Sequence, residues 1–116
     1  MLGLNLLVLR CRDVEQARRF YERLLRVQFE QHKHGGGPVH WACEDEQGVI
    51  EIYPANPDAP ADSVGLGFAV ADLEQVRREL IADGNQVQPI KVNPWGRTFV
   101  VRDPDGRRVE VKQKEV

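Results

Sequence analysis

Apolar and polar residues follow the same pattern twice along this chain, and the pattern predicts strands before and after each of two helices. Apolar strands are expected at 4–10 and 65–71. After each of them, apolar residues recur every three or four positions, which is the period of an amphipathic helix. The helical positions are Val14, Ala17, Phe20, Tyr21, Leu24 and Leu25 in the first half, and Leu73, Val76, Leu80 and Ile81 in the second.

Three further strands follow each helix, so each half predicts the order β-α-β-β-β. Strand-like segments occupy 27–32, 39–44 and 49–53 in the first half and 85–90, 98–102 and 108–112 in the second. Asp13 and Asp72 precede the helices, and a glutamine follows each of them three residues later, as in a capping box. The sequences DEQG (45–48) and DPDG (103–106) predict hairpin turns, and Gly84 with Asn85 is expected to end the second helix.

The two halves also match residue by residue. RDVEQARR (12–19) and ADLEQVRR (71–78) share five of eight residues at a shift of 59, and the same shift places Glu51 on Glu110. One shift that serves both ends of each half without a gap indicates an internal duplication. We therefore expect a single domain, 1–116, made of a first module at 3–54, a linker at 55–63 and a second module at 64–114.

Strand alternation assigns the side chains of each sheet to two faces. In the last strand of each half, Ile50, Ile52, Val109 and Val111 point toward the helix, and Glu51, Tyr53, Glu110 and Lys112 point away from it. Each sheet then has an apolar face under its helix and a mixed polar face. The predicted fold class is α+β, with two tandem β-α-β-β-β modules whose curved mixed sheets form a cup.

Composition narrows the possible partners. The chain is 41% hydrophobic and 29% charged, and its net charge of −2 is spread without basic or acidic blocks, so nothing favours nucleic acid or an anionic membrane. The N-terminal apolar run ends at Arg10 and is too short to span a bilayer. We expect a cytoplasmic protein in which Cys11 and Cys43 are reduced and packed as small hydrophobic residues.

Two segments resemble a known superfamily. RDVEQARRFYERLL (12–25) and PWGRTFVVRDPDGRRVEV (94–111), together with the paired halves, resemble the vicinal-oxygen-chelate superfamily of glyoxalases, bleomycin-resistance proteins and extradiol dioxygenases. The second segment is similar to the ligand-binding half of bleomycin-resistance proteins. The resemblance implies the glyoxalase/bleomycin-resistance fold and a homodimer whose ligand pockets are formed by halves of both chains.

The resemblance also gives four metal-ligand positions, which here are Leu6, Glu51, Gly65 and Glu110. Metal-dependent members usually have histidine at the first and third of these, and leucine and glycine cannot replace it. Two carboxylates alone are a poor site for zinc or nickel, although water could complete a weak octahedral site for magnesium or manganese. The prediction is no metal and no cofactor, and the alternative is one weakly bound divalent metal.

All three histidines, His32, His34 and His40, lie within nine residues and look like a metal site. Neither His32 nor His34 is at a ligand position implied by the resemblance, and the glycines at 35–37 favour a mobile hairpin tip. The first interpretation is a solvated hairpin tip, and the second is that one histidine, with His34 as the candidate, contacts a ligand at the rim. The third is a metal site formed by all three histidines.

The polar faces supply the remaining candidates. Glu51 and Glu110 are the catalytic candidates as acid and base; alternatively they anchor a cationic ligand, or Arg10, Arg108 and Lys112 on the same faces neutralise them. Trp95 stacks on a planar ligand, as the resemblance suggests, or packs on its own loop. Arg10, Tyr53 and Arg108 are candidate ligand-binding residues. Trp41 and Phe99 are assigned to the core.

Three functions fit these candidates. The first is a metal-free protein that binds and sequesters a small molecule such as an antibiotic or a metabolite. The second is a divergent glyoxalase-like lyase or isomerase, related to the dioxygenases, that uses Glu51 or Glu110 with or without a weak divalent metal. The third is a dimerisation module without ligand chemistry.

Overall fold

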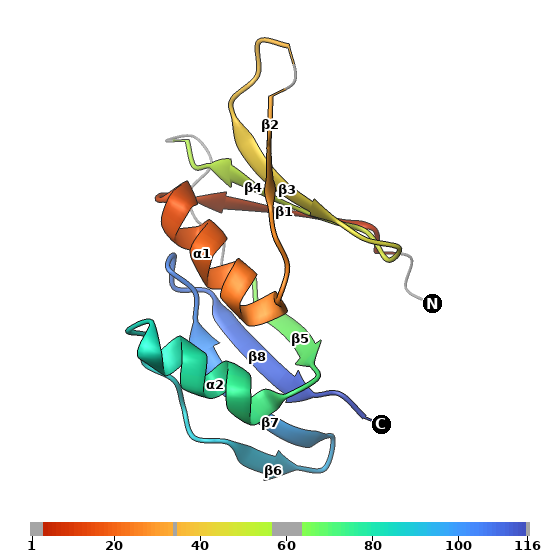
Figure 1. Ribbon diagram of the computed structural model, residues 1–116, viewed down its shortest axis with the longest axis vertical. Helices are drawn as coiled ribbons and strands as arrows, with labels where there is room; N and C mark the ends of the chain where they lie inside the picture. The colour runs from red at the N-terminus through yellow and green to blue at the C-terminus, as the bar shows by residue number, and fades with distance from the viewer. Residues whose placement is uncertain (1–3, 34, 57–63, 116) are drawn as a thin grey trace.

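The computed structural model describes residues 4–33, 35–56 and 64–115 and confirms the β-α-β-β-β order in both halves (Figure 1). The first half contains β1 (Leu6–Cys11), α1 (Val14–Leu25), β2 (Glu30–His32), β3 (His40–Glu44) and β4 (Val49–Pro54). The second half contains β5 (Leu66–Val70), α2 (Leu73–Ala82), β6 (Lys91–Asn93), β7 (Gly96–Arg102) and β8 (Arg108–Gln113). None of the described helices is long and apolar enough to span a membrane.

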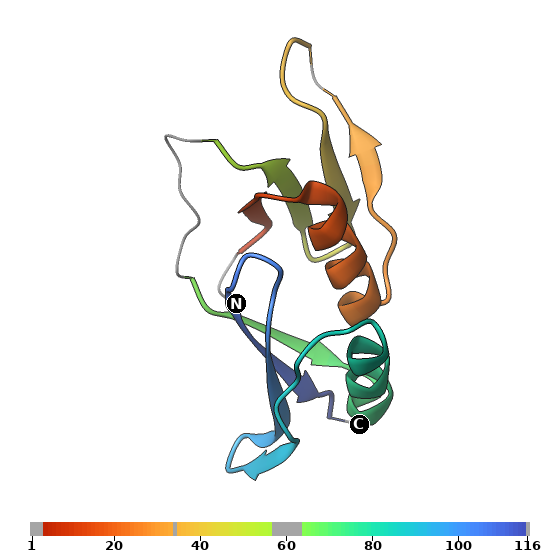
Figure 2. The same cartoon turned by 90° about the vertical axis from the view of Figure 1, so that its left-hand side faces the viewer.

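Each half forms its own four-stranded mixed sheet. The strand orders are β1-β4-β3-β2 and β5-β8-β7-β6, so the first strand of each half lies at a sheet edge beside the last. β1 pairs parallel to β4 and β5 to β8, while the other pairs are antiparallel. A parallel pair needs a long crossover, and the helix that supplies it covers one face of the sheet. Figure 2 shows the two helices stacked one above the other on the same side of the molecule.

The helices begin and end as the sequence predicts. The Asp13 carboxylate accepts a hydrogen bond from the Gln16 amide at 3.0 Å, and Asp72 accepts one from Gln75 at 3.1 Å. Each bond satisfies one of the free amides of the first helical turn. The second helix ends just before Gly84, whose φ of +97° suits glycine, and the Asn85 side chain donates to the Leu80 carbonyl at 2.9 Å.

The core lies between each sheet and its helix. Strand alternation correctly assigned Ile52, Val109 and Val111 to this side, since all three are fully buried. Phe99 is 1% exposed, and Trp41 packs against the core while partly buried, as expected. The other buried hydrophobic residues are Leu9, Cys11, Ala17, Phe20, Tyr21, Leu24, Phe29, Val70, Leu73, Val76, Leu80 and Val101.

Two predicted strands were wrong: one is shorter than expected and the other does not form. The segment 27–32 forms a strand only at Glu30–His32, because the Phe29 amide bonds to the Glu22 carboxylate at 2.9 Å instead of joining a ladder. The segment 85–90 is not a strand: it contributes an isolated bridge between Val87 and Val101, and β6 begins only after Pro89. Proline lacks the amide that a ladder needs, which explains the late start. Most of the linker predicted at 55–63 lies outside the described residues.

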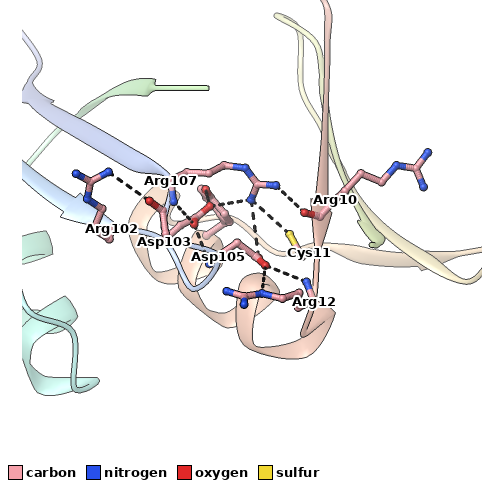
Figure 3. Close-up of polar contacts among 9 residues, drawn as sticks. Arg10, Cys11, Arg12, Arg102, Asp103, Asp105 and Arg107 are labelled. Carbon is pink, nitrogen blue, oxygen red and sulfur yellow. Dashed lines mark hydrogen bonds and ion pairs between the residues drawn. The ribbon is translucent and has the colours of Figure 1, made fainter. Parts of the chain in front are cut away.

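A buried polar network joins the two halves (Figure 3). Asp103 and Arg107, from the turn between β7 and β8, form an ion pair of 3.0 Å with both side chains fully buried. The Tyr21 hydroxyl on α1 donates to the Asp103 carboxylate at 2.6 Å, and Arg107 donates to the Arg10 carbonyl on β1 at 2.6 Å. The second-half turn is thereby held against the first half.

Asp105 extends this network. The sequence predicted that Asp105 serves only to form the turn. Its carboxylate also accepts hydrogen bonds from the Arg12 backbone amide at 3.0 Å and the Arg12 side chain at 3.2 Å. Cys11 lies beside the network, 3.8 Å from the Arg107 guanidinium. Burial of the thiol raises the pKa of Cys11 to about 12, so the thiol stays protonated and unreactive at neutral pH. Both cysteines are free, as expected.

We predict that Arg107→Ala destabilises the protein by about 3–5 kcal/mol, because it leaves the Asp103 carboxylate buried without its cation. The measurement is the free energy of unfolding in urea. Arg78→Ala is the matched control, since Arg78 is exposed on α2, and its effect should stay within about 0.5 kcal/mol. Equal stability losses in the two variants would contradict a structural role for the network.

Candidate functional site

The side chains that point away from the helices form an open face on each sheet. The strand register places Val8 and Ala42 beside Glu51, and Arg10 beside Tyr53. In the second half, Gly67 and Val100 flank Glu110. The alternation argument therefore put Glu51, Tyr53 and Glu110 on the correct face.

Four residues of the first half, Arg10, His40, Glu51 and Tyr53, form a cluster that we call the His40 cluster. The imidazole of His40 stacks on the Tyr53 ring with centroids 4.2 Å apart and an interplanar angle of 9°. Its Nε2 lies 3.5 Å from the Glu51 carboxylate, and the Arg10 guanidinium lies 4.8 Å from the centre of the Tyr53 ring. The Tyr53 hydroxyl is 3.4 Å from the same Nε2, but stacked rings put it above the imidazole plane, which makes a poor hydrogen bond.

His40 is the functional candidate that the sequence did not single out. It is 1% exposed, and it faces Glu51 from β3 rather than extending into a solvated hairpin. His40 lies two residues before Ala42 on β3, so the two side chains share a face, and Ala42 is opposite Glu51. Strand alternation was therefore the signal that could have placed His40 beside Glu51. Glu51 therefore has His40 as its partner, while Arg10, expected to neutralise it, stacks on Tyr53.

The other two histidines add little to this site. His32 pairs with His40 in register, and the two ring centres lie 6.0 Å apart. His34, the histidine proposed to contact a ligand, lies outside the described residues. Over residues 4–33, 35–56 and 64–115, no three His, Cys, Asp or Glu side chains come together in a group that could hold a metal ion.

The second half places Trp95 and Glu110 beside a cavity of about 370 Å³. The indole N–H of Trp95 donates to the Glu110 carboxylate at 3.2 Å, and an Arg108 nitrogen lies 3.8 Å from the other carboxylate oxygen. Trp95 is nevertheless 55% exposed, so its ring is fixed at one edge and otherwise accessible. Trp41, by contrast, packs against the core.

Within the chain, the His40 cluster and the cavity are separate. The described residues that line the cavity come from the second half, between Gln86 and Glu110. Where the structure describes the chain, the main contacts between the halves are made by α1 with α2 and by the buried network at the 103–107 turn. Glu51 and Glu110 therefore belong to two half-sites, one on each sheet.

The residues at the implied metal-ligand positions do not fit a transition-metal centre. Leu6 is 48% exposed on β1 and offers only an apolar side chain, and Gly65 offers none. The two remaining carboxylates lie on different sheets and have His40 and Trp95 as their respective partners. We therefore derive no step of a mechanism through a metal.

The sequence and the fold agree with a known family. The family model of the Glyoxalase/Bleomycin resistance protein/Dioxygenase superfamily matches residues 3–111. The chain belongs to this superfamily. The resemblance seen in the sequence is thus confirmed, while no curated protein matches the chain.

Several solved structures share this fold over nearly the whole chain. TnmS3, an antibiotic binding protein from Streptomyces sp. CB03234, has a TM-score of 0.78 at 23% identity and covers 97% of this chain and 95% of its own. A glyoxalase/bleomycin resistance protein from the same organism has a TM-score of 0.67 at 26% identity, with coverage of 95% and 100%. The oxidase ChaP-H1 has a TM-score of 0.74 at 17% identity, with coverage of 99% and 98%.

We predict that Leu6→His combined with Gly65→His creates a transition-metal site in a homodimer whose two kinds of half-site face each other, because it adds two imidazoles to Glu51 and Glu110. Gly65 accepts a side chain: its φ is not positive, and the nearest atom to an added Cβ is 4.0 Å away. Structural zinc contributes on the order of 10 kcal/mol in small domains, so even a poor site is measurable. Titration calorimetry with zinc and nickel should show tighter binding than in the parent protein.

Leu6→Gln combined with Gly65→Ala is the control, since it changes the same positions without adding an imidazole. A folded double-histidine variant that binds zinc no better than this control would show that the four positions do not converge in the assembled protein.

Proposed function

We propose that this superfamily member binds a small organic molecule on the open faces of its sheets and sequesters it without converting it. The observation that carries the proposal is Trp95. It is 55% exposed beside the 370 Å³ cavity, with its indole N–H fixed on Glu110. Concave sites with an aromatic anchor and a few polar groups are the usual design for small-molecule binding, and tryptophan is enriched at binding hot spots.

The solved relatives support a binding role. TnmS3 is an antibiotic binding protein, and a second relative from the same organism is a glyoxalase/bleomycin resistance protein. For the present chain we propose an antibiotic or a metabolite of similar size as the ligand.

We further propose a homodimer in which the first half of one chain faces the second half of its partner. β1 and β5 are edge strands, and exposed edges are usually covered in stable proteins. Exposed apolar residues lie on or beside these strands: Leu4 is 74% exposed, Leu6 48% and Val64 52%. A partner that covers them would bring the His40 cluster of one chain to the cavity of the other.

A divergent lyase or isomerase is the second candidate, and the His40–Glu51 contact of 3.5 Å favours it. A histidine held beside a carboxylate is a common acid–base arrangement. The third candidate, a dimerisation module without a ligand, would need both carboxylates to be occluded. Instead the side chains of Glu51 and Glu110 are 20% and 29% exposed.

We predict that Trp95→Ala weakens binding about thirtyfold, since a hot-spot tryptophan contributes about 2 kcal/mol. The dissociation constant is measured for a ligand found by a thermal-shift screen of antibiotics and ketoaldehydes. Trp41→Ala is the matched control: Trp41 packs against the core and beside Arg18, so its loss should reduce stability by about 3 kcal/mol and leave affinity unchanged. The reverse ranking of the two variants would refute the proposed site.

We predict that the binding site is shared between chains, and mixing two inactive variants tests this. Tyr53→Ala and Trp95→Ala each damage both pockets of a homodimer. A heterodimer of the two variants contains one pocket with Tyr53 and Trp95 both intact, so co-expression with two tags should restore half of the wild-type binding sites. A monomer of 13.2 kDa by light scattering, or a heterodimer without restored binding, would rule out the shared pocket.

A further inference from the structure

The cavity beside Trp95 is cationic, although the whole chain has a net charge of −2. Among the described residues that line it, three are basic, Lys91, Arg102 and Arg108, and one is acidic, Glu110. Glu110 is already engaged, because it accepts the Trp95 indole N–H and lies 3.8 Å from Arg108.

The other two cations are not neutralised by carboxylates. Arg102 donates to the Gly106 carbonyl at 3.3 Å, which is a neutral acceptor. Among the residues that the structure describes, neither Lys91 nor Arg102 forms an ion pair with a carboxylate. Two positive charges therefore line the same cavity as Trp95 without a carboxylate partner among the described residues.

From this arrangement we infer that the ligand is a planar aromatic anion, such as an aromatic carboxylate or phenolate, held between the Trp95 ring and the side chains of Lys91 and Arg102. The inference rests on the proposed function and names its ligand class. It replaces the alternative that Glu110 anchors a cationic ligand, since that carboxylate already has two partners and lies among cations. A guanidinium or ammonium near a cavity favours an anionic group, and an exposed indole favours a flat ring.

The partner's half-site would add charges of both signs. The open face of the first half carries the cation Arg10 and the carboxylates Glu30, Glu44 and Glu51, and Glu51 already contacts His40. The inference therefore rests on the cations that line the cavity of the second half.

Three naphthalene probes of similar size test the inference: 2-naphthoate, 2-naphthalenemethanol and 2-naphthylmethylammonium. We expect the anion to bind most tightly and the cation most weakly in titration calorimetry of the full-length protein. Lys91→Met and Arg102→Met should each weaken naphthoate binding about fivefold, which corresponds to about 1 kcal/mol, and leave the neutral alcohol unaffected. Lys114→Met is the matched control, because Lys114 is exposed in the same half and does not line the cavity.

The inference is overturned if the alcohol or the ammonium binds as tightly as naphthoate, if Lys91→Met and Arg102→Met leave the preference for naphthoate unchanged, or if no probe binds. Trp95→Ala separates this failure from that of the proposed function. If the alcohol binds best and Trp95→Ala abolishes its binding, only the charge of the ligand is wrong. If all probes bind Trp95→Ala as they bind the parent protein, the site itself is wrong.

Discussion

The buried ion pair between Asp103 and Arg107 fixes the relation of the two halves. Burying two charges is costly unless further hydrogen bonds satisfy them. The Asp105 and Arg107 backbone amides of the same turn satisfy one Asp103 oxygen, and two further bonds come from the other half of the chain, through the Tyr21 hydroxyl and the Arg10 carbonyl. The pair has its full set of these bonds only when the 103–107 turn rests against β1 and α1. Both helices lie on one side of the molecule (Figure 2).

The two open faces differ in chemistry. The first half presents a buried histidine stacked on a tyrosine and in contact with a carboxylate, while the second presents an exposed tryptophan beside a cationic cavity. The two faces are separate within the chain. We propose that a second chain attaches at the edge strands β1 and β5 and supplies the surface that closes the pocket.

The sequence predicted the features that depend on local periodicity and missed the contacts between residues that are far apart in the chain. Strand alternation placed Glu51 and Glu110 on the open faces, and the two aspartates before the helices act as caps. The contacts of Asp103 with Tyr21 and of Arg107 with Arg10 join residues 82 and 97 positions apart, and no local pattern encodes them. The DPDG motif indicated only a turn, although its first aspartate is also a buried acceptor.

The carboxylates at the superfamily's metal positions have roles here that need no metal. Glu110 fixes the edge of the Trp95 ring through the indole N–H, which orients the ring while leaving it accessible. Glu51 lies against the imidazole of His40, which the stacked Tyr53 holds in place. Leu6 and Gly65 stand at the other two positions and offer no ligand atom. We therefore propose that the four positions that form a metal centre in metal-dependent members form two organic half-sites in this chain, in which each carboxylate contacts an aromatic ring.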